Sequence, residues 1–202
     1  MRTFIAVDIS DAARRLLLDL ARRLDRSLDS ASIGGCVRWT APENLHLTLR
    51  FLGETSDAQR RAVAGGLASR LAAQPAFVLA VWQLGVFPNW RRPNILWVDF
   101  TGGVASLERT QALVEDAVAH AGFPAEERPF TPHLTIGRVK KDASPAVRQK
   151  LGELLQQEQA ATTARLDTPA AQFTVDAVTF VRSDLRPAGP VYTPLARYSL
   201  NG

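Results

Sequence analysis

Two short motifs of the same form contain two of the three histidines of the chain. His46-Leu-Thr-Leu49 and His133-Leu-Thr-Ile136 both follow the pattern His-x-Thr-aliphatic. Two chance matches in a chain with so few histidines have odds on the order of one in a thousand. Because side chains alternate between the two faces of a β-strand, the histidine and the threonine of each motif project together. Each motif therefore predicts a strand with an imidazole and a hydroxyl on one face and aliphatic side chains on the other.

A pair of histidines beside hydroxyl groups is suited to acid–base catalysis. Histidine has an unperturbed pKa of ~6.5, so one member of a pair can be neutral while the other is protonated at neutral pH. The neutral ring can take a proton from water, and the protonated ring can give one to a leaving oxygen. The hydroxyls of Thr48 and Thr135 can hold an anionic oxygen. Together with His46 and His133, they predict metal-free hydrolysis of a phosphodiester, above all a strained cyclic one.

Other interpretations explain less of this pattern. A lone histidine on a strand is usually a structural residue bonded to the backbone, but the repetition of the whole motif argues against that. A zinc site lacks ligands, because His120 lies at the end of an expected helix and Cys36 has no partner cysteine. The chain contains no Gly-x-Ser-x-Gly motif for a nucleophilic serine. We therefore expect no metal ion and no cofactor.

The motifs belong to an alternation of strands and helices that occurs twice. The pattern predicts strands at 4–9, 37–39, 45–52, 77–86, 95–100, 131–139, 173–181 and 192–200, and helices at 11–28, 57–72, 104–121 and 145–157. Residues 4–8 match 95–99 at nearly the same offset that relates the two motifs. We therefore predict one domain with a duplicated, two-lobed α/β (α+β) fold, its repeat halves at about 1–90 and 91–202.

Each lobe is predicted to contain a mainly antiparallel sheet with helices outside, because the links between successive strands are short. A pseudo-twofold axis would relate the lobes, and the two histidine motifs would face each other across a central groove.

Length, composition and charge limit the class of protein. The chain has 202 residues, of which 46% are hydrophobic and 22% charged, so it can bury a sizeable core. No apolar run approaches the ~18–20 residues of a membrane helix, and Asp8 interrupts any signal-peptide core. The single cysteine excludes an internal disulfide and favours a reducing compartment. We expect a cytoplasmic, monomeric protein; its net charge of +4 comes from scattered arginines rather than from a polybasic block.

The motifs and their surroundings resemble the two-histidine phosphoesterases, in particular the bacterial and archaeal RNA 2',3'-cyclic phosphodiesterases, also called 2'-5' RNA ligases. The similar segments are 2–7, 39–54, 130–138 and 185–192, so the resemblance extends over nearly the whole chain. It implies that the partner is an RNA 3' end, whose 2',3'-cyclic phosphate is hydrolysed to a 2'-phosphomonoester and a free 3'-hydroxyl. It also allows a minor 2'-5' RNA ligase activity.

The same resemblance implies roles for individual residues. His46 would be the proton donor to the leaving oxygen, and His133 would be the proton acceptor that activates water. Thr48 and Thr135 would bind the phosphate. Arg138 matches the arginine that follows the second motif in this family, and it would be a further phosphate ligand.

Strand alternation gives a different prediction for the arginines beside the motifs. Arg138 has the parity of the aliphatic residues, so it reaches the histidine face only if a β-bulge at Gly137 turns the strand. Arg50 has the parity of His46 with no special geometry, and it is therefore predicted to line the site as well. For both arginines the alternative is a solvated strand end.

The loop 87–94 is a second candidate for substrate contact. It carries Phe87 and Trp90, and aromatic rings can stack on the unpaired bases of single-stranded RNA. The alternative is an ordinary exposed hairpin in which Phe87 packs on the core.

Two other functions stay open at this point. A related two-histidine esterase could act on small cyclic nucleotides, an ADP-ribose cyclic phosphate or 2'-5' oligonucleotides. A non-catalytic module could bind RNA ends without turnover. The presence of both histidines favours an enzyme over the binding module.

Overall fold

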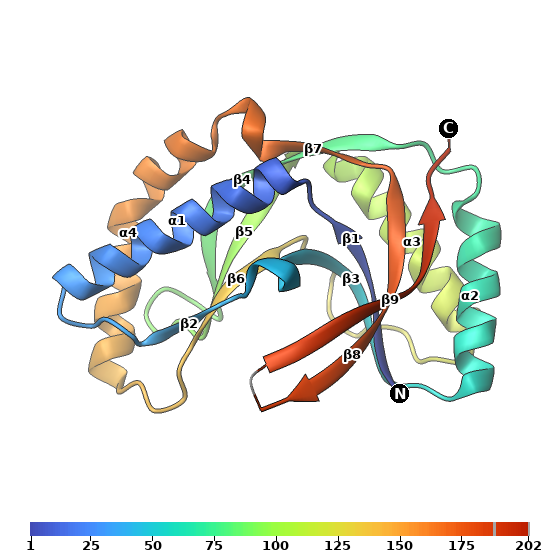
Figure 1. Cartoon of the computed structure of the whole chain (residues 1–202), viewed down its shortest axis with the longest axis horizontal. Helices are drawn as coiled ribbons and strands as arrows, with labels where there is room; N and C mark the ends of the chain where they lie inside the picture. The colour runs from blue at the N-terminus through green and yellow to red at the C-terminus, as the bar shows by residue number, and fades with distance from the viewer. Residues whose placement is uncertain (188, 202) are drawn as a thin grey trace.

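The computed structural model describes residues 1–187 and 189–201, which form two antiparallel sheets and four α-helices (Figure 1). Sheet A has the strand order β3-β1-β8-β9, and sheet B has the order β2-β6-β5-β4-β7. The strands are β1 Arg2–Asp8, β2 Val37–Trp39, β3 His46–Glu54, β4 Phe77–Phe87, β5 Ile95–Gly102, β6 Leu134–Val139, β7 Gln172–Val175, β8 Ala177–Arg186 and β9 Gly189–Ser199. The helices are α1 Asp11–Ser30, α2 Asp57–Leu71, α3 Val104–His120 and α4 Pro145–Leu166, with short 3-10 turns η1 Pro42–Asn44 and η2 Pro169–Ala171.

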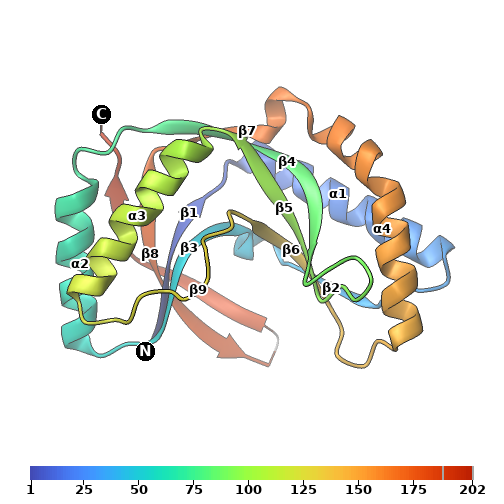
Figure 2. The same cartoon turned by 180° about the vertical axis from the view of Figure 1, so that it is seen from behind.

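The helices form two pairs at opposite ends of the molecule (Figures 1 and 2). Helices α2 and α3 pack on one face of sheet A, and α1 and α4 pack on one face of sheet B. We call the other face of each sheet its helix-free face. Strands β3 and β6, one from each sheet, lie side by side in the centre of the molecule.

Helix starts and apolar faces follow the local sequence. The Ser10 hydroxyl accepts a hydrogen bond from the Ala13 amide and caps α1. The buried leucines of α1 recur at helical spacing: Leu17, Leu20, Leu24 and Leu28. Ser56 and Gln59 form a reciprocal capping box at α2, and Ser144 caps α4 just before a proline in its first turn. These signals explain why the predicted helix starts agree with the structure.

The two sheets have equivalent strand orders. If β1, β3, α1 and α2 are matched with β5, β6, α3 and α4, the order β3-β1-β8-β9 corresponds to β6-β5-β4-β7. Each sheet therefore contains strands from both parts of the chain, because β8 joins β1 in sheet A and β4 joins β5 in sheet B. The predicted two-lobed α+β fold with mainly antiparallel sheets is confirmed. The repeat boundaries 1–90 and 91–202 stay a prediction.

Three predicted segments away from the histidine motifs differ from the structure. The strand predicted at 173–181 is two strands, β7 in sheet B and β8 in sheet A, and the chain changes sheets at Asp176. The helix predicted to end at residue 157 continues to Leu166, because the segment 157–165 is rich in the strong helix formers Gln, Glu and Ala. The loop predicted at 183–190 is largely a β-hairpin, in which Arg186 pairs with Gly189; residue 188 lies outside the described residues.

Buried side chains of both lobes belong to one continuous core. The cluster includes Val63 and Leu67 of α2, Leu24 of α1 and Leu155 of α4, all fully buried. Cys36 is a free thiol at the edge of this core. Within residues 1–187 and 189–201, none of the helices combines the length and the apolar character that crossing a membrane requires.

A pair of helical glycines tests how tightly the β4–β5 loop rests on α4. A methyl group at Gly152 would overlap the carbonyl oxygen of Trp90, whereas a methyl group at Gly65 would enter open space. We expect Gly152→Ala to destabilise the fold by about 1–3 kcal/mol through overpacking, and Gly65→Ala to stabilise it by about 0.5–1 kcal/mol. Urea denaturation measures both free energies of unfolding. Equal effects of the two substitutions would contradict this packing.

Candidate active site

His46 stands at the start of β3, opposite Asp8 of β1. Its Nδ1 lies 2.8 Å from the carbonyl oxygen of Asn44, so Nδ1–H donates to that carbonyl in the neutral ring. Nε2 then has no proton, and it lies 3.0 Å from the Thr48 hydroxyl, which can donate to it. The ring is thereby held in one orientation, with Nε2 left for proton exchange.

The backbone that anchors His46 is itself tied to distant elements. Asn44 belongs to η1, and its side-chain amide donates to the carbonyl of Pro190 on β9, at 3.1 Å. Arg14 of α1 donates to the carbonyl of Leu45, at 3.2 Å. Two separate elements, α1 and β9, therefore hold the segment whose carbonyl binds the His46 ring.

Aromatic rings surround His46 on the helix-free face of sheet A. Phe4 stacks on it with ring centroids 4.8 Å apart, and Tyr192 of β9 meets it edge-on at 5.2 Å. Burial lowers the pKa of His46, because it disfavours the charged ring, and Arg14 acts in the same direction. The hydrogen bond to Asn44 and the charge of Asp8 raise this pKa but only partly offset burial.

His133 has the same anchoring as His46, although it lies just before its strand. The predicted strand 131–139 begins only at Leu134. The Nδ1 atom of His133 lies 2.8 Å from the carbonyl oxygen of Thr131, which is two residues earlier in the chain. Asn44 likewise precedes His46 by two residues. Phe87 meets the ring edge-on at 5.1 Å, and Trp97 lies 6.1 Å away. In both motifs Nδ1 is held by a backbone carbonyl, and Nε2 is the nitrogen that remains for chemistry.

The threonines and the aliphatic residues of both motifs follow the predicted alternation. Thr48 pairs with Ala6, and Thr135 pairs with Trp97, and both threonines are half-buried. The aliphatic side chains between and beyond them are buried in the core: Leu47, Leu49, Leu134 and Ile136. Since β3 and β6 lie side by side (Figures 1 and 2), the structure brings the two motifs to neighbouring strands of different sheets.

Arg138 reaches the face of Thr135 through a β-bulge. Along β5, Trp97 pairs with Thr135 and Ile95 pairs with Arg138, so the register skips one residue between them. A methyl group at Gly137 would come within 2.8 Å of the Val37 side chain, so glycine fits the close strand contact at this bulge. The side chain of Arg138 is exposed, and its charge opposes the rise in the pKa of Tyr192 that burial causes. Arg138 therefore lies near the ring that contacts His46.

The prediction that Arg50 shares the face of His46 is wrong. The register of β1 and β3 also shifts by one residue, and it places Arg50 opposite the buried Ile5. Arg50 is only 7% exposed and forms ion pairs with Glu115 and Glu126 on the helix-covered side.

Phe51 takes the place that Arg50 was expected to have. It pairs with Phe4, and it is 58% exposed. Phe51 and Arg138 are each the fifth residue after their histidine, so the two halves of the site differ in charge at equivalent positions.

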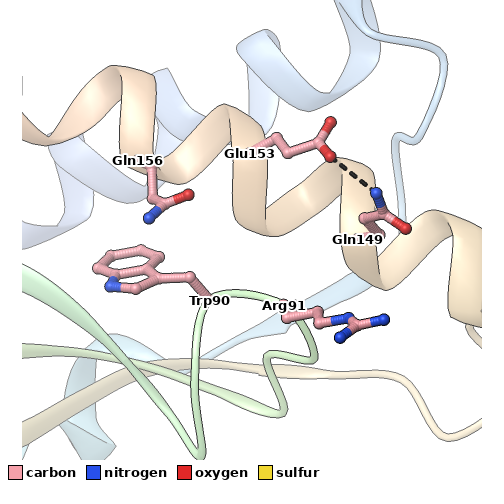
Figure 3. A pocket seen from close by; sticks show the side chains of 5 residues that line it. All are labelled: Trp90, Arg91, Gln149, Glu153 and Gln156. Carbon is pink, nitrogen blue, oxygen red and sulfur yellow. Dashed lines mark hydrogen bonds between the residues drawn. The ribbon is translucent and has the colours of Figure 1, made fainter.

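The structure separates the two aromatic residues of the loop 87–94. Phe87 stacks on Trp97 beside His133. Trp90 instead packs against α4, where it lines a hollow of about 490 Å³ together with Arg91, Gln149, Glu153 and Gln156 (Figure 3). Because α4 covers the other face of sheet B, Trp90 is not beside His133, and its contact with RNA stays a prediction.

Several residues at the site were not predicted from the sequence. Phe4, Trp97 and Tyr192 contact the histidine rings. Trp97 lies two residues before the polar Asp99, so strand alternation places both on the same face of β5, and this was an available signal that Trp97 is on the helix-free face. Tyr192 lies within a segment that resembles the family. The carbonyls of Asn44 and Thr131 carry no signal in residue type, because every residue has one.

Comparison with known proteins assigns the family. Residues 18–187 match the sequence profile described as the 2'-5' RNA ligase superfamily. The chain belongs to the 2'-5' RNA ligase superfamily. The match covers both histidine motifs, all strands of sheet B, and strands β3 and β8 of sheet A.

Relatives within the superfamily are similar over their full length. An RNA 2',3'-cyclic phosphodiesterase of Thermotoga maritima is 32% identical, and the alignment covers 100% of this chain and 97% of the relative. A protein of the same name from Methanothermobacter thermautotrophicus is also 32% identical, with 99% of each chain covered. A crystal structure of a Thermus thermophilus protein has a TM-score of 0.71 at 26% identity, covering 100% of this chain and 99% of the other. E. coli LigT complexed with 3'-AMP has the same fold, with a TM-score of 0.74 at 23% identity and coverage of 100% and 98%.

The environment of His46 predicts how this ring titrates. We expect NMR of the imidazole nitrogens to show Nδ1 protonated in the neutral ring, with a titration midpoint below the ordinary ~6.5. Asp8→Asn removes a charge that raises the pKa, so it shifts the midpoint to still lower pH. Glu54→Gln, which removes an exposed carboxylate at the far end of β3, is the control and leaves the midpoint unchanged. A midpoint above that of an unperturbed histidine, or a rise in Asp8→Asn, would contradict this account.

Proposed function

We propose that this protein hydrolyses the terminal 2',3'-cyclic phosphate of RNA to a 2'-phosphomonoester and a free 3'-hydroxyl. The observation that carries the proposal is the paired anchoring of His46 and His133. Each ring has Nδ1 at a backbone carbonyl and Nε2 left for proton exchange, and the two rings lie at the starts of neighbouring strands, His46 in β3 and His133 just before β6. The names of the superfamily relatives from Thermotoga and Methanothermobacter support the same reaction.

The reaction needs one proton acceptor and one proton donor. His133 Nε2 takes a proton from water as the water oxygen attacks phosphorus, and the bond from phosphorus to O3' breaks. His46 Nε2 then gives its proton to O3', so the 3'-hydroxyl is released and the phosphate stays on O2'. This assignment of donor and acceptor follows the resemblance to the two-histidine phosphoesterases.

The surroundings of the two rings suit an anionic substrate. The hydroxyls of Thr48 and Thr135 and the guanidinium of Arg138 share the helix-free faces with the histidines, and they can hold the phosphate oxygens. Burial disfavours protonated His46 in the free protein. A bound phosphate raises its pKa again, because a nearby negative charge favours the imidazolium. Substrate binding therefore prepares His46 to donate its proton.

No step of this reaction requires a metal ion. Within residues 1–187 and 189–201, no three His, Cys, Asp or Glu side chains are grouped so that they could hold one. A minor 2'-5' ligase activity would use the same chemistry with another nucleophile: the 5'-hydroxyl of a second RNA would attack the cyclic phosphate in place of water, the bond from phosphorus to O3' would break, and a 2'-5' linkage would form. Small cyclic nucleotides present the same phosphate and are the alternative substrates.

Substitution of each histidine tests the mechanism. We expect His46→Ala and His133→Ala each to lower kcat on an RNA with a terminal 2',3'-cyclic phosphate by about 100-fold or more, because each removes a proton-transfer group. His120→Ala is the matched control: His120 lies at the end of α3, where its Nδ1 is close to the carbonyl of Asp116. The activity of the His120→Ala variant should equal that of the unsubstituted protein. Activity retained in either His46→Ala or His133→Ala, with the fold intact by circular dichroism, would refute the mechanism.

Product analysis and chelation test the chemistry separately. A short RNA ending in a 2',3'-cyclic phosphate is incubated with the protein, and chromatography resolves the 2'- from the 3'-monophosphate. We expect the 2'-monophosphate alone, and the same rate after dialysis against EDTA. A 3'-monophosphate product would reverse the assigned leaving group, and loss of activity in EDTA would contradict catalysis by the two histidines without metal.

A further inference from the structure

Two arginines face each other directly across strands β2 and β6. Arg38 pairs with Arg138, between the neighbouring pairs Val37 with Val139 and Trp39 with Gly137. The valines are buried, and alternation places both arginines on the opposite face of the two strands, where both side chains are exposed. Directly opposite residues of an antiparallel pair have Cβ atoms roughly 4.5–5.5 Å apart. The two guanidinium groups therefore have overlapping reach.

Neither arginine is neutralised by a carboxylate. Across residues 1–187 and 189–201, no salt bridge or side-chain hydrogen bond of Arg38 or Arg138 is found. Three strand arginines have such partners, namely Arg50, Arg182 and Arg197, whereas Arg2 and Arg186 at strand ends have none among the described residues. Like charges placed directly opposite on a sheet destabilise it. The pair thus lacks a structural benefit, whereas the guanidinium fork is the protein group best matched to phosphate oxygens.

The pair adjoins the candidate active site on one side only. Arg138 shares a strand face with Thr135 and acts on Tyr192, the ring that contacts His46. Strand β2 lies beyond β6 in the sheet order, so Arg38 is one strand spacing, about 4.8 Å, farther from β5 than Arg138 is. If Arg138 holds the phosphate between the histidines, Arg38 is placed to meet the next phosphate of the same RNA strand.

We propose that Arg38 binds the internucleotide phosphate on the 5' side of the nucleotide that carries the cyclic phosphate. This inference rests on the proposed function and narrows it to a substrate class. A cyclic mononucleotide has a single phosphorus and therefore has no second phosphate that Arg38 could bind. An RNA end offers a second phosphate, so the site is built for oligonucleotide ends rather than for small cyclic nucleotides.

The test compares two substrates that differ in the second phosphate. Arg38→Ala is assayed with adenosine 2',3'-cyclic phosphate and with a five-nucleotide RNA ending in the same group. We expect KM to rise about tenfold for the RNA, as the loss of one charge-assisted contact requires, and to stay unchanged for the mononucleotide. For the RNA, the slope of log KM against log salt concentration should fall by about 0.7, the contribution of one phosphate on a single strand.

Matched variants separate binding from folding. Arg38→Lys keeps the charge without the fork, and it should recover part of the affinity for RNA. Arg165→Ala removes an exposed arginine in the last turn of α4, and it should leave KM unchanged for both the mononucleotide and the RNA. Because removal of Arg38 relieves a like-charge contact, the Tm of Arg38→Ala should equal or exceed that of the unsubstituted protein.

Three outcomes would overturn the proposal. An equal rise in KM for both substrates would mean that Arg38 acts on the cyclic phosphate itself, and no rise for either would mean that it binds no phosphate. If the unsubstituted protein hydrolyses neither substrate, the proposed function fails, and fluorescence anisotropy with a 5'-labelled RNA bearing a 3'-phosphate decides the inference alone. Weaker binding by Arg38→Ala than by Arg165→Ala supports the contact, and equal binding refutes it.

Discussion

The hydrogen bond from an imidazole Nδ1 to the backbone carbonyl two residues earlier is the interaction on which the site depends. It occurs at His46 with Asn44 and at His133 with Thr131. By occupying Nδ1, it leaves Nε2 for the proton exchange of the proposed reaction, and it fixes the direction in which each ring points. Everything that holds η1 in place, including the bonds from Arg14 and from Asn44 to Pro190, therefore also holds the orientation of His46.

Local sequence patterns predicted most of the framework but not the breaks in regularity. The histidines, the threonines and the helix starts follow from alternation, capping residues and repetition. Arg50 was misplaced because one register shift between β1 and β3 reverses the faces beyond Thr48, and no residue there marks a bulge. Beside Arg138, in contrast, Gly137 indicated a bulge, and the register between β5 and β6 does shift there. Contacts from β9, such as Tyr192, could not be placed, because they depend on tertiary packing.

The near-symmetry of the two motifs hides a chemical difference. Equivalent positions hold the exposed aromatic Phe51 beyond the first histidine and the cationic Arg138 beyond the second. Burial lowers the pKa of His46, so a bound phosphate has to offset this effect before His46 can act as the proposed proton donor.

The exchange of strands between the sheets has a mechanical consequence. In a two-lobed enzyme with a linker between the lobes, hinge bending can open and close the site. Here β8 is hydrogen-bonded to β1 in one lobe and β4 to β5 in the other, while β7 continues directly into β8. A rotation that drew the lobes apart would strain these connections, so the exchanged strands oppose hinge bending between the sheets that carry the two motifs.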